Sequence, residues 1–156
     1  MERKIILMVR KVLIVLLIIW MLVIFLLSNQ AGEQSRGLSH KVALLLTFNN
    51  EESATQLEPI IRKVAHLTEY AVGAMLFYGI LITYGPIAIK WKIGMTIAFI
   101  ILFAGLDELH QKFINERNSS LLDVGIDTFG GLLGTGACYL LDAMIKIIDN
   151  KVKENI

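Results

Sequence analysis

The stretch VLIVLLIIWMLVIFLL, Val12–Leu27, decides the fold of this chain, because every side chain in it is apolar. No charged residue lies between Lys11 and Glu33, and a bilayer core about 30 Å thick is crossed by about 20 helical residues. The stretch therefore predicts a membrane-spanning helix. Its basic start resembles a signal peptide, but the run is long and Ser28-Asn29-Gln30-Ala31 offers no clear cleavage site. We expect an uncleaved first span over about residues 12–28.

The composition of the whole chain also indicates that lipid is its solvent. Of its 156 residues, 55% are hydrophobic and only 19% are charged, and the mean hydropathy is +0.63. A soluble chain this short is mostly surface and needs more charged residues to cover it. The single cysteine, Cys138, excludes a disulfide scaffold. The sequence contains no basic patch for nucleic acid, so the lipid bilayer is the expected partner.

Three further spans are predicted over about residues 64–84, 93–111 and 121–148, so that residues 1–156 form a single integral membrane domain. The third and fourth spans contain uncharged cores of only 14 residues, 93–106 and 128–141. They reach membrane length only if the flanking acidic residues belong to the helices. These carboxylates are therefore expected at or inside the membrane boundary.

The distribution of Lys and Arg predicts the orientation of the chain. If the N-terminus lies in the cytoplasm, the cytoplasmic segments carry nine of these residues and the external segments carry six. The nine are Arg3, Lys4, Arg10, Lys11, Lys90, Lys92, Lys146, Lys151 and Lys153, and the six are Arg36, Lys41, Arg62, Lys63, Lys112 and Arg117. The cytoplasmic loops of membrane proteins carry the excess. Both termini of this multi-pass chain are therefore expected in the cytoplasm.

Residues 28–62, between the first two spans, are predicted to contain two short helical pieces. Apolar residues recur at helical spacing in Ser39–Phe48, which is typical of a helix lying in the membrane interface. Ser53–Arg62, opened by a Ser cap and interrupted only by Pro59, leads into the second span. The expected fold is all-α, a polytopic membrane protein with four transmembrane helices and short extracytoplasmic interfacial helices between the first and second.

Ionisable and polar residues gather at those ends of the second, third and fourth spans that the charge count places outside. They are His66, Glu69 and Tyr70; Asp107, Glu108, His110 and Gln111; and Asp123 and Asp127, with Arg62, Lys63 and Arg117 beside them. Within each group, helical spacing places most members on one face. An Asp at the centre of a span costs about 2.5 to 3.5 kcal/mol on insertion scales. These side chains are therefore expected to face one another in a polar cup.

The residue types in this cup predict several kinds of chemistry. The candidates for catalysis are His66, Glu69, Asp107 and Glu108, because His and carboxyl groups serve as general acids and bases. The candidates for substrate binding are Arg62, Lys63, Tyr70, Gln111, Arg117, Asp123 and Asp127. Oxygen-rich sites select hard divalent cations such as Mg²⁺. The candidate metal ligands are Asp107, Glu108 and Asp123.

Structural interpretations stay open for each of these elements. Asp123 and Asp127 could cap the start of the fourth span, and His66 with Glu69 could be an intrahelical pair. The motif Gly130-x-x-x-Gly134 favours close helix packing, and a homodimer through these two glycines is an alternative.

Together, the three blocks of polar residues resemble the VanZ-like membrane proteins. The blocks are Arg62-Lys63-x-x-His66-x-x-Glu69-Tyr70, then Asp107-Glu108-x-x-Gln111 with Arg117, then Asp123-x-x-x-Asp127-x-x-Gly130-x-x-x-Gly134, preceded by Ser28-x-Gln30, Ser35 and Ser39. The likeness covers roughly residues 12–148, and the family usually carries Asn where this chain has Asp127. The resemblance implies a small polytopic protein of the bacterial cytoplasmic membrane. The founding member is associated with low-level resistance to teicoplanin, and it acts without replacing the D-Ala-D-Ala terminus of peptidoglycan precursors.

Three classes of function follow from the polar cup and the resemblance. The first is the binding or modification of a lipid-linked cell-envelope component, such as a cell-wall precursor, with Arg62, Lys63 and Arg117 at its phosphate. The second is a metal-dependent membrane enzyme that acts on a polyprenyl or lipid phosphate. The third is an ion- or proton-coupled transporter, which ranks last because the acids gather at one end and the inner halves of the spans are apolar.

Overall fold

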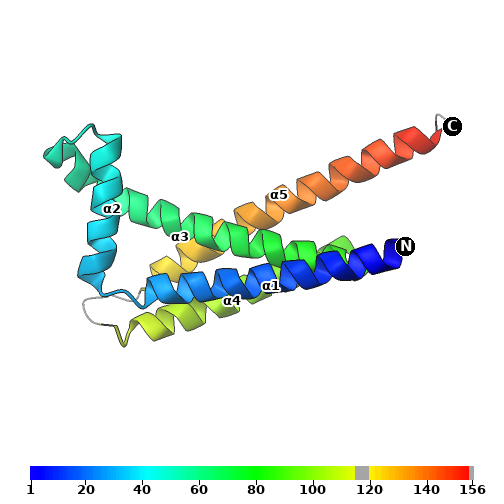
Figure 1. Ribbon diagram of the computed structural model, residues 1–156, viewed down its shortest axis with the longest axis horizontal. Coiled ribbons are helices and arrows are strands. Elements are labelled where there is room, and N and C mark those ends of the chain that lie inside the picture. The colour runs from blue at the N-terminus through cyan, green and yellow to red at the C-terminus, as the bar shows by residue number, and fades with distance from the viewer. Residues whose placement is uncertain (115–119, 155–156) are drawn as a thin grey trace.

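The computed structural model describes residues 1–114 and 120–154, and this part of the chain forms five helices. They are α1 (Glu2–Ser28), α2 (Gly32–Leu46), α3 (Glu51–Ile82), α4 (Ile89–Gln111) and α5 (Leu121–Glu154). The four long helices run along the length of the molecule, α2 lies across one end, and both termini lie at the other end (Figure 1). The predicted all-helical fold, with four spans and a short helix between the first two, is confirmed.

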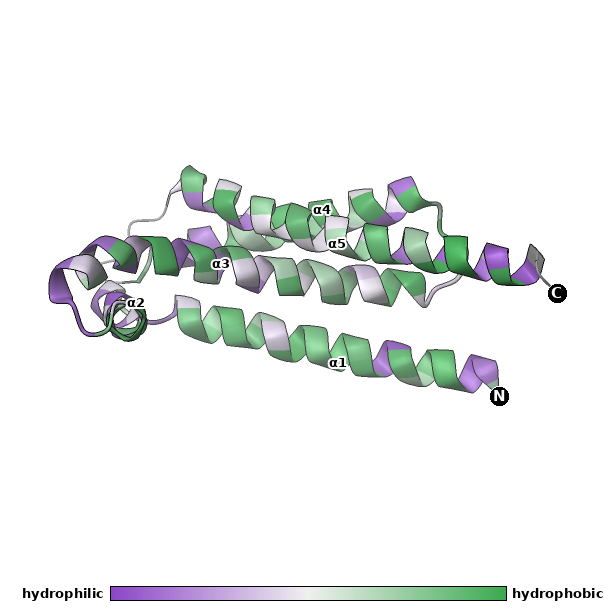
Figure 2. Cartoon of the chain, turned by 90° about the horizontal axis from the view of Figure 1, so that it is seen from above, coloured by the Kyte–Doolittle hydropathy of each residue, from purple (hydrophilic) through white to green (hydrophobic). Residues whose placement is uncertain are grey.

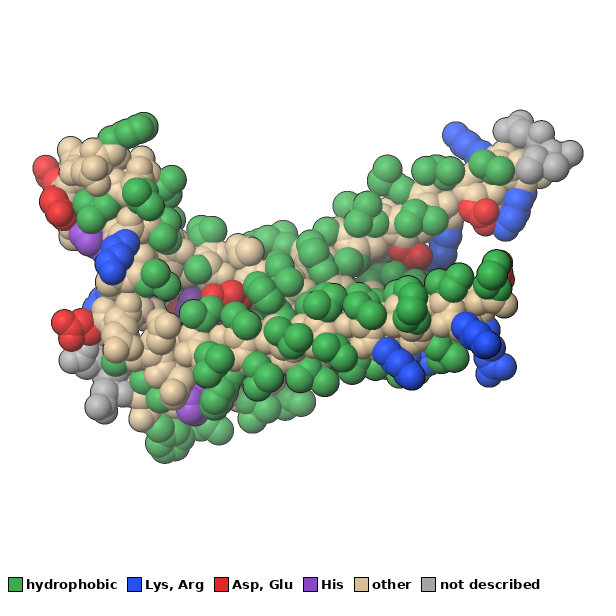
Figure 3. All heavy atoms as spheres, viewed as in Figure 1, with side chains coloured by type: hydrophobic (Ala, Val, Ile, Leu, Met, Phe, Trp, Pro, Cys, Tyr) green, Lys and Arg blue, Asp and Glu red, His purple; other side chains and the backbone are tan. Residues whose placement is uncertain are grey.

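The surfaces of the four long helices are those of a multi-pass membrane protein. Each helix is long and apolar enough to cross a bilayer. In α1, only 11% of the most apolar window is buried inside the protein, and Ile18 and Leu22 are more than half exposed. The long helices are mostly hydrophobic along their length and hydrophilic near their ends (Figure 2), and the space-filling view shows apolar side chains over them (Figure 3). These apolar flanks contact the lipid bilayer.

The segment between α1 and the second span differs from the expected pair of short helices. Helix α2 begins at Gly32 rather than near Ser39. The second predicted piece, residues 53–62, is instead the first part of α3, which continues through Pro59. The cap is Asn50 rather than Ser53, because the Asn50 side chain accepts a hydrogen bond from the Ser53 backbone nitrogen at 3.0 Å.

A sharp reversal joins α2 to α3. Phe48 and Asn49 both have positive φ angles, 51° and 62°, in the left-handed region that residues other than glycine seldom adopt. Across this turn, His40 Nε2 on α2 lies 3.1 Å from Glu51 Oε2 on α3. The reversal folds α2 back against the first turns of α3.

The hydrophobic core forms where α1, α3 and α4 meet. It consists of Ile24, Tyr70, Ala74, Ile100 and Ala104, with Trp20, Phe99, Phe103 and Val124 packed against it. The indole nitrogen of Trp20 donates a hydrogen bond to the Glu69 carbonyl oxygen at 2.8 Å, which joins α1 to α3. This core fixes the part of α3 that leads into the polar end of the molecule.

Two glycines allow the backbone of α5 to approach the backbone of α3 closely. A β-carbon at Gly130 would stand 2.2 Å from the Leu67 carbonyl oxygen, and one at Gly134 would stand 2.2 Å from that of Ala71. The packing interpretation of the motif is therefore confirmed. The homodimer stays a prediction, and in the single chain the face of α5 that carries Gly130 and Gly134 packs on α3.

The end that carries the termini also holds buried charge, which the sequence interpretation missed. Lys92 is 5% exposed, and its Nζ lies 3.5 Å from Asp142 Oδ2, linking α4 to α5. Near the start of α1, Arg10 donates hydrogen bonds to the side chain and carbonyl oxygen of Thr83 and lies 3.8 Å over the ring of Tyr84. Ion pairing and stacking thus hold this end of the helices together.

Candidate functional site

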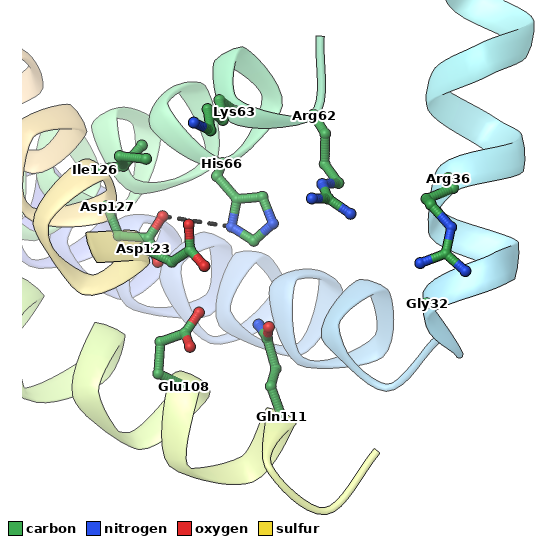
Figure 4. Close-up of a pocket in the computed structure, with 10 residues that line it drawn as sticks. All are labelled: Gly32, Arg36, Arg62, Lys63, His66, Glu108, Gln111, Asp123, Ile126 and Asp127. Carbon is green, nitrogen blue, oxygen red and sulfur yellow. Dashed lines mark ion pairs between the residues drawn. The ribbon is translucent and has the colours of Figure 1, made fainter. Parts of the chain in front are cut away.

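A polar cavity of about 170 Å³ lies at the end of the molecule opposite the termini, where α2, α3, α4 and α5 converge (Figure 4). Its walls combine cationic, anionic and neutral groups. They are formed by Gly32, Arg36, Arg62, Lys63, His66, Glu108, Gln111, Asp123, Ile126 and Asp127. Seven of the residues expected in the polar cup therefore line one cavity between four elements, whereas Glu69, Tyr70, Asp107 and His110 do not line it.

Except for Lys63, whose side chain points toward α5, the charges within the cavity are separated by sign (Figure 4). Glu108 on α4 and the two aspartates of α5 lie on one side, whereas the guanidinium groups of Arg62 and Arg36 reach in from the other side (Figure 4). His66 lies between these two sides. The arrangement suits a ligand with a negative group at the arginine side.

One contact between charged groups of the cavity joins His66 to Asp127. His66 Nδ1 lies 3.4 Å from Asp127 Oδ1, and the Asp127 side chain is fully buried whereas that of His66 is 20% exposed. Neither Asp127 oxygen accepts a hydrogen bond from any residue that the structure describes. A buried carboxylate without such donors is costly, so the imidazole is its main source of stabilisation in the described part of the chain.

Helix packing explains why these two side chains meet. His66 precedes Leu67 on α3, and Asp127 precedes Gly130 by one turn on α5. The contact of Gly130 with the Leu67 backbone brings the two helices together at this level. A larger residue at position 130 would hold Asp127 farther from the imidazole.

Asp107, by contrast, lies outside the cavity lining and belongs to a buried network. Its Oδ2 accepts hydrogen bonds from Ser28 Oγ at 2.8 Å, Gln111 Nε2 at 2.9 Å and the Tyr70 hydroxyl at 3.2 Å. Gln111 Nε2 also donates to Ser28 Oγ at 3.1 Å. These bonds tie α1, α3 and α4 together, so the contacts of Asp107 and Tyr70 are those of a structural network.

The neighbouring acid, Glu108, points to a different place. Consecutive residues on a helix are about 100° apart, so Glu108 faces the cavity while Asp107 faces α1 and α3. Glu108 is 4% exposed, and its Oε2 accepts a hydrogen bond from the Ser120 backbone nitrogen at 2.9 Å. Glu108 therefore both lines the cavity and holds the start of α5 near the end of α4.

The proposed metal ligands Asp107, Glu108 and Asp123 are not gathered as a set. Among residues 1–114 and 120–154, no group of three or more His, Cys, Asp or Glu side chains is placed to hold a metal ion. The physical reason is the divergence of Asp107 from Glu108 on α4. Arg117, expected to bind substrate, lies outside the described residues.

A second, smaller cavity of about 80 Å³ adjoins the first. It is lined by Leu27, Ser28, Gln30, Ser35, Leu38, Ser39, Arg62, Ala65, His66 and Glu69. Glu69 therefore faces this cavity, whereas Arg62 and His66 line both. The serines that accompany the family resemblance thus gather beside the main cavity, on the α1 and α2 side.

Arg36 is the charged cavity residue that the sequence interpretation missed, together with Gly32 and Ile126 of the cavity wall. It lies in α2, at a distance of 26 residues from Arg62, and it reaches the cavity only because α2 crosses the end of the molecule. Helical spacing within one segment cannot give the angle between two helices. The only available signal was that Arg36 lies near the serines of the same segment.

Comparison with known proteins supports the resemblance. Residues 13–142 match the family described as VanZ/LLP1. Comparison with curated protein sequences and with solved structures finds no match. The matched range begins within α1, ends within α5 and includes every described residue of the polar cavity. This multi-pass membrane protein therefore belongs to the VanZ/LLP1 family.

Proposed function

We propose that the protein binds the phosphate headgroup of a lipid-linked cell-envelope component in the cavity between α2, α3, α4 and α5. The observation that carries this proposal is that Arg36, Arg62 and Lys63 all line one cavity at the end of the spans, with the guanidinium groups of Arg36 and Arg62 on the same side of it (Figure 4). Arg and Lys are the side chains that best recognise phosphate, Arg through two parallel hydrogen bonds and Lys as a point charge.

The position of the cavity suits a lipid rather than a free anion. Ile126 forms part of its wall, and residues such as Leu122 and Phe129 on α5 expose apolar surface. A polyprenyl or acyl tail can therefore extend along the apolar helix flanks while its phosphate lies among the cationic groups. Carboxylates on the other side of the cavity limit its net positive charge. The cavity is therefore expected to bind one specific headgroup rather than to attract anionic lipids in general.

This function fits a bacterial cytoplasmic membrane protein whose cavity faces outward and whose termini lie in the cytoplasm. Sequestering a lipid-linked cell-wall precursor would alter how lipid-anchored glycopeptides act at the membrane surface. Expression from an inducible promoter is therefore expected to raise the minimum inhibitory concentration of teicoplanin. An unchanged minimum inhibitory concentration would mean that headgroup binding by this protein does not lead to teicoplanin resistance.

Native mass spectrometry of the purified full-length protein with a polyprenyl phosphate tests the binding site. The wild type should retain the lipid phosphate, and Arg62→Gln should retain at least about tenfold less, because a charged hydrogen bond contributes about 1.5–3 kcal/mol. Lys41→Gln is the matched control, since Lys41 is an exposed base on α2 that does not line the cavity. Equal retention by wild type and Arg62→Gln would contradict the proposal.

A further inference from the structure

We propose that His66 and Asp127 form a catalytic dyad that hydrolyses the terminal phosphate of a lipid diphosphate, with His66 as the general base and Asp127 as its positioning residue. This inference rests on the proposed function, because it needs a phosphate headgroup in the cavity. It adds a reaction and a substrate class to that binding site.

The geometry of the pair supports the proposal. Asp127 Oδ1 lies 3.4 Å from Nδ1 of His66, and Asp127 is fully buried. The second ring nitrogen, Nε2, points away from Asp127 toward the side of the cavity on which Arg62 lies (Figure 4). The contact is an ion pair, and a carboxylate beside one imidazole nitrogen stabilises the imidazolium that forms when the other nitrogen takes a proton.

The other charged groups of the two cavities fit two roles, in which cations bind the phosphate and carboxylates stabilise the protonated imidazole. The charged groups that line the two cavities together with His66 are Arg36, Arg62, Lys63, Glu69, Glu108, Asp123 and Asp127. The two arginines, which lie on the Nε2 side, can neutralise the non-bridging oxygens of a diphosphate there (Figure 4). The carboxylates of α4 and α5 stabilise positive charge on the ring. His66 lies between the acidic residues and the arginine side of the cavity. A phosphate bound at the arginine side would therefore lie next to His66, which could take a proton from a water molecule there.

The proposed reaction balances with water as the second reactant. The water oxygen attacks the terminal phosphorus, and the bond from that phosphorus to the bridging oxygen breaks. His66 Nε2 accepts one proton from the attacking water; the bridging oxygen, on the opposite side of the phosphorus, departs as part of the lipid monophosphate anion, and His66 releases its proton to solvent water. The products are the lipid monophosphate and inorganic phosphate, and the dyad returns to its starting state.

Two measurements on the same full-length protein in lipid nanodiscs test the dyad. One is release of inorganic phosphate from a polyprenyl diphosphate, and the other is binding of a polyprenyl monophosphate. His66→Ala should lower the hydrolysis rate at least about 100-fold, which is the lower range for loss of a general base. Added imidazole should raise the hydrolysis rate of His66→Ala at least about tenfold, because imidazole can enter the space left by the side chain. A merely structural histidine would not be rescued in this way.

Asp127→Asn tests the positioning role, because it keeps the size of the side chain and removes its charge. The rate should fall at least about tenfold, and the acidic limb of the rate–pH profile should move to lower pH, since the imidazolium loses the carboxylate that stabilises it. His40→Ala is the control, because His40 pairs with Glu51 and lines neither cavity. It should leave the rate unchanged.

The outcomes separate this inference from the binding function. Binding of the monophosphate without release of phosphate by the wild type would overturn the dyad and leave the binding proposal standing. Failure of the wild type to bind would overturn both. Hydrolysis that persists in His66→Ala, with the variant shown to fold by circular dichroism and size-exclusion chromatography, would also overturn the dyad.

Discussion

The backbone of Gly130 lies so close to that of Leu67 that a β-carbon at position 130 would stand 2.2 Å from the Leu67 carbonyl oxygen. This contact sets the distance between α5 and α3 at the polar end of the molecule. Since His66 is adjacent to Leu67 and Asp127 lies one turn before Gly130, the same contact brings the imidazole to the buried carboxylate. The packing of α5 on α3 and the geometry of the site therefore both depend on the absence of a side chain at position 130.

Gly130→Ala is expected to destabilise the protein and to separate the dyad. The added methyl group must displace backbone rather than a flexible side chain, which costs about 1–3 kcal/mol. Thermal unfolding in detergent measures this loss. Gly136→Ala on the same helix is the control, because nothing lies within 4 Å of a β-carbon at position 136. Equal unfolding temperatures for the two variants would contradict the role of the close contact.

Asp107→Ala is expected to lower the free energy of unfolding by about 1–3 kcal/mol, because it leaves three buried hydrogen-bond donors without their shared acceptor. Asp107→Asn retains an acceptor oxygen at the same place, so its effect should be smaller. Both variants should bind polyprenyl phosphate once folded, since Asp107 does not line the cavity. Loss of binding in folded Asp107→Asn would instead make Asp107 a ligand contact.

The sequence was sufficient to predict the four spans, because a bilayer imposes a minimum length of apolar helix that Val12–Leu27 meets without help from tertiary contacts. It was also sufficient to place His66, Glu108 and Asp127 at one end. Spacing along a helix could not show that Asp107 turns away from the cavity, because the direction of a face depends on which helix packs against it. It could not place Arg36 either, since that residue depends on the turn at Phe48 and Asn49.

At the end of the molecule that carries the termini, the contribution of each lysine near Asp142 to the free energy of unfolding should depend on how deeply that lysine is buried. Lys92→Ala is expected to cost about 1–3 kcal/mol, because it removes a buried charged partner of Asp142. Lys146 also lies near Asp142, at 2.9 Å, but its side chain is 62% exposed, so Lys146→Ala should cost less than about 1 kcal/mol. Chemical denaturation of both variants compares the two contributions. A larger loss of free energy of unfolding in Lys146→Ala than in Lys92→Ala would make Lys146 the more important partner of Asp142.

The expected orientation can be tested with single cysteines placed at the two ends of the molecule. Cys138 is the only cysteine in the chain, so Cys138→Ser supplies a background without thiols. Phe48 is 94% exposed at the end that holds the cavity, and Lys153 is exposed near the C-terminus. If the cavity faces outward, a membrane-impermeant maleimide should label Phe48→Cys in intact cells and should label Lys153→Cys only after the membrane is opened. The reverse pattern would place the cavity in the cytoplasm, and the lipid phosphate that it binds would then have to come from the inner leaflet.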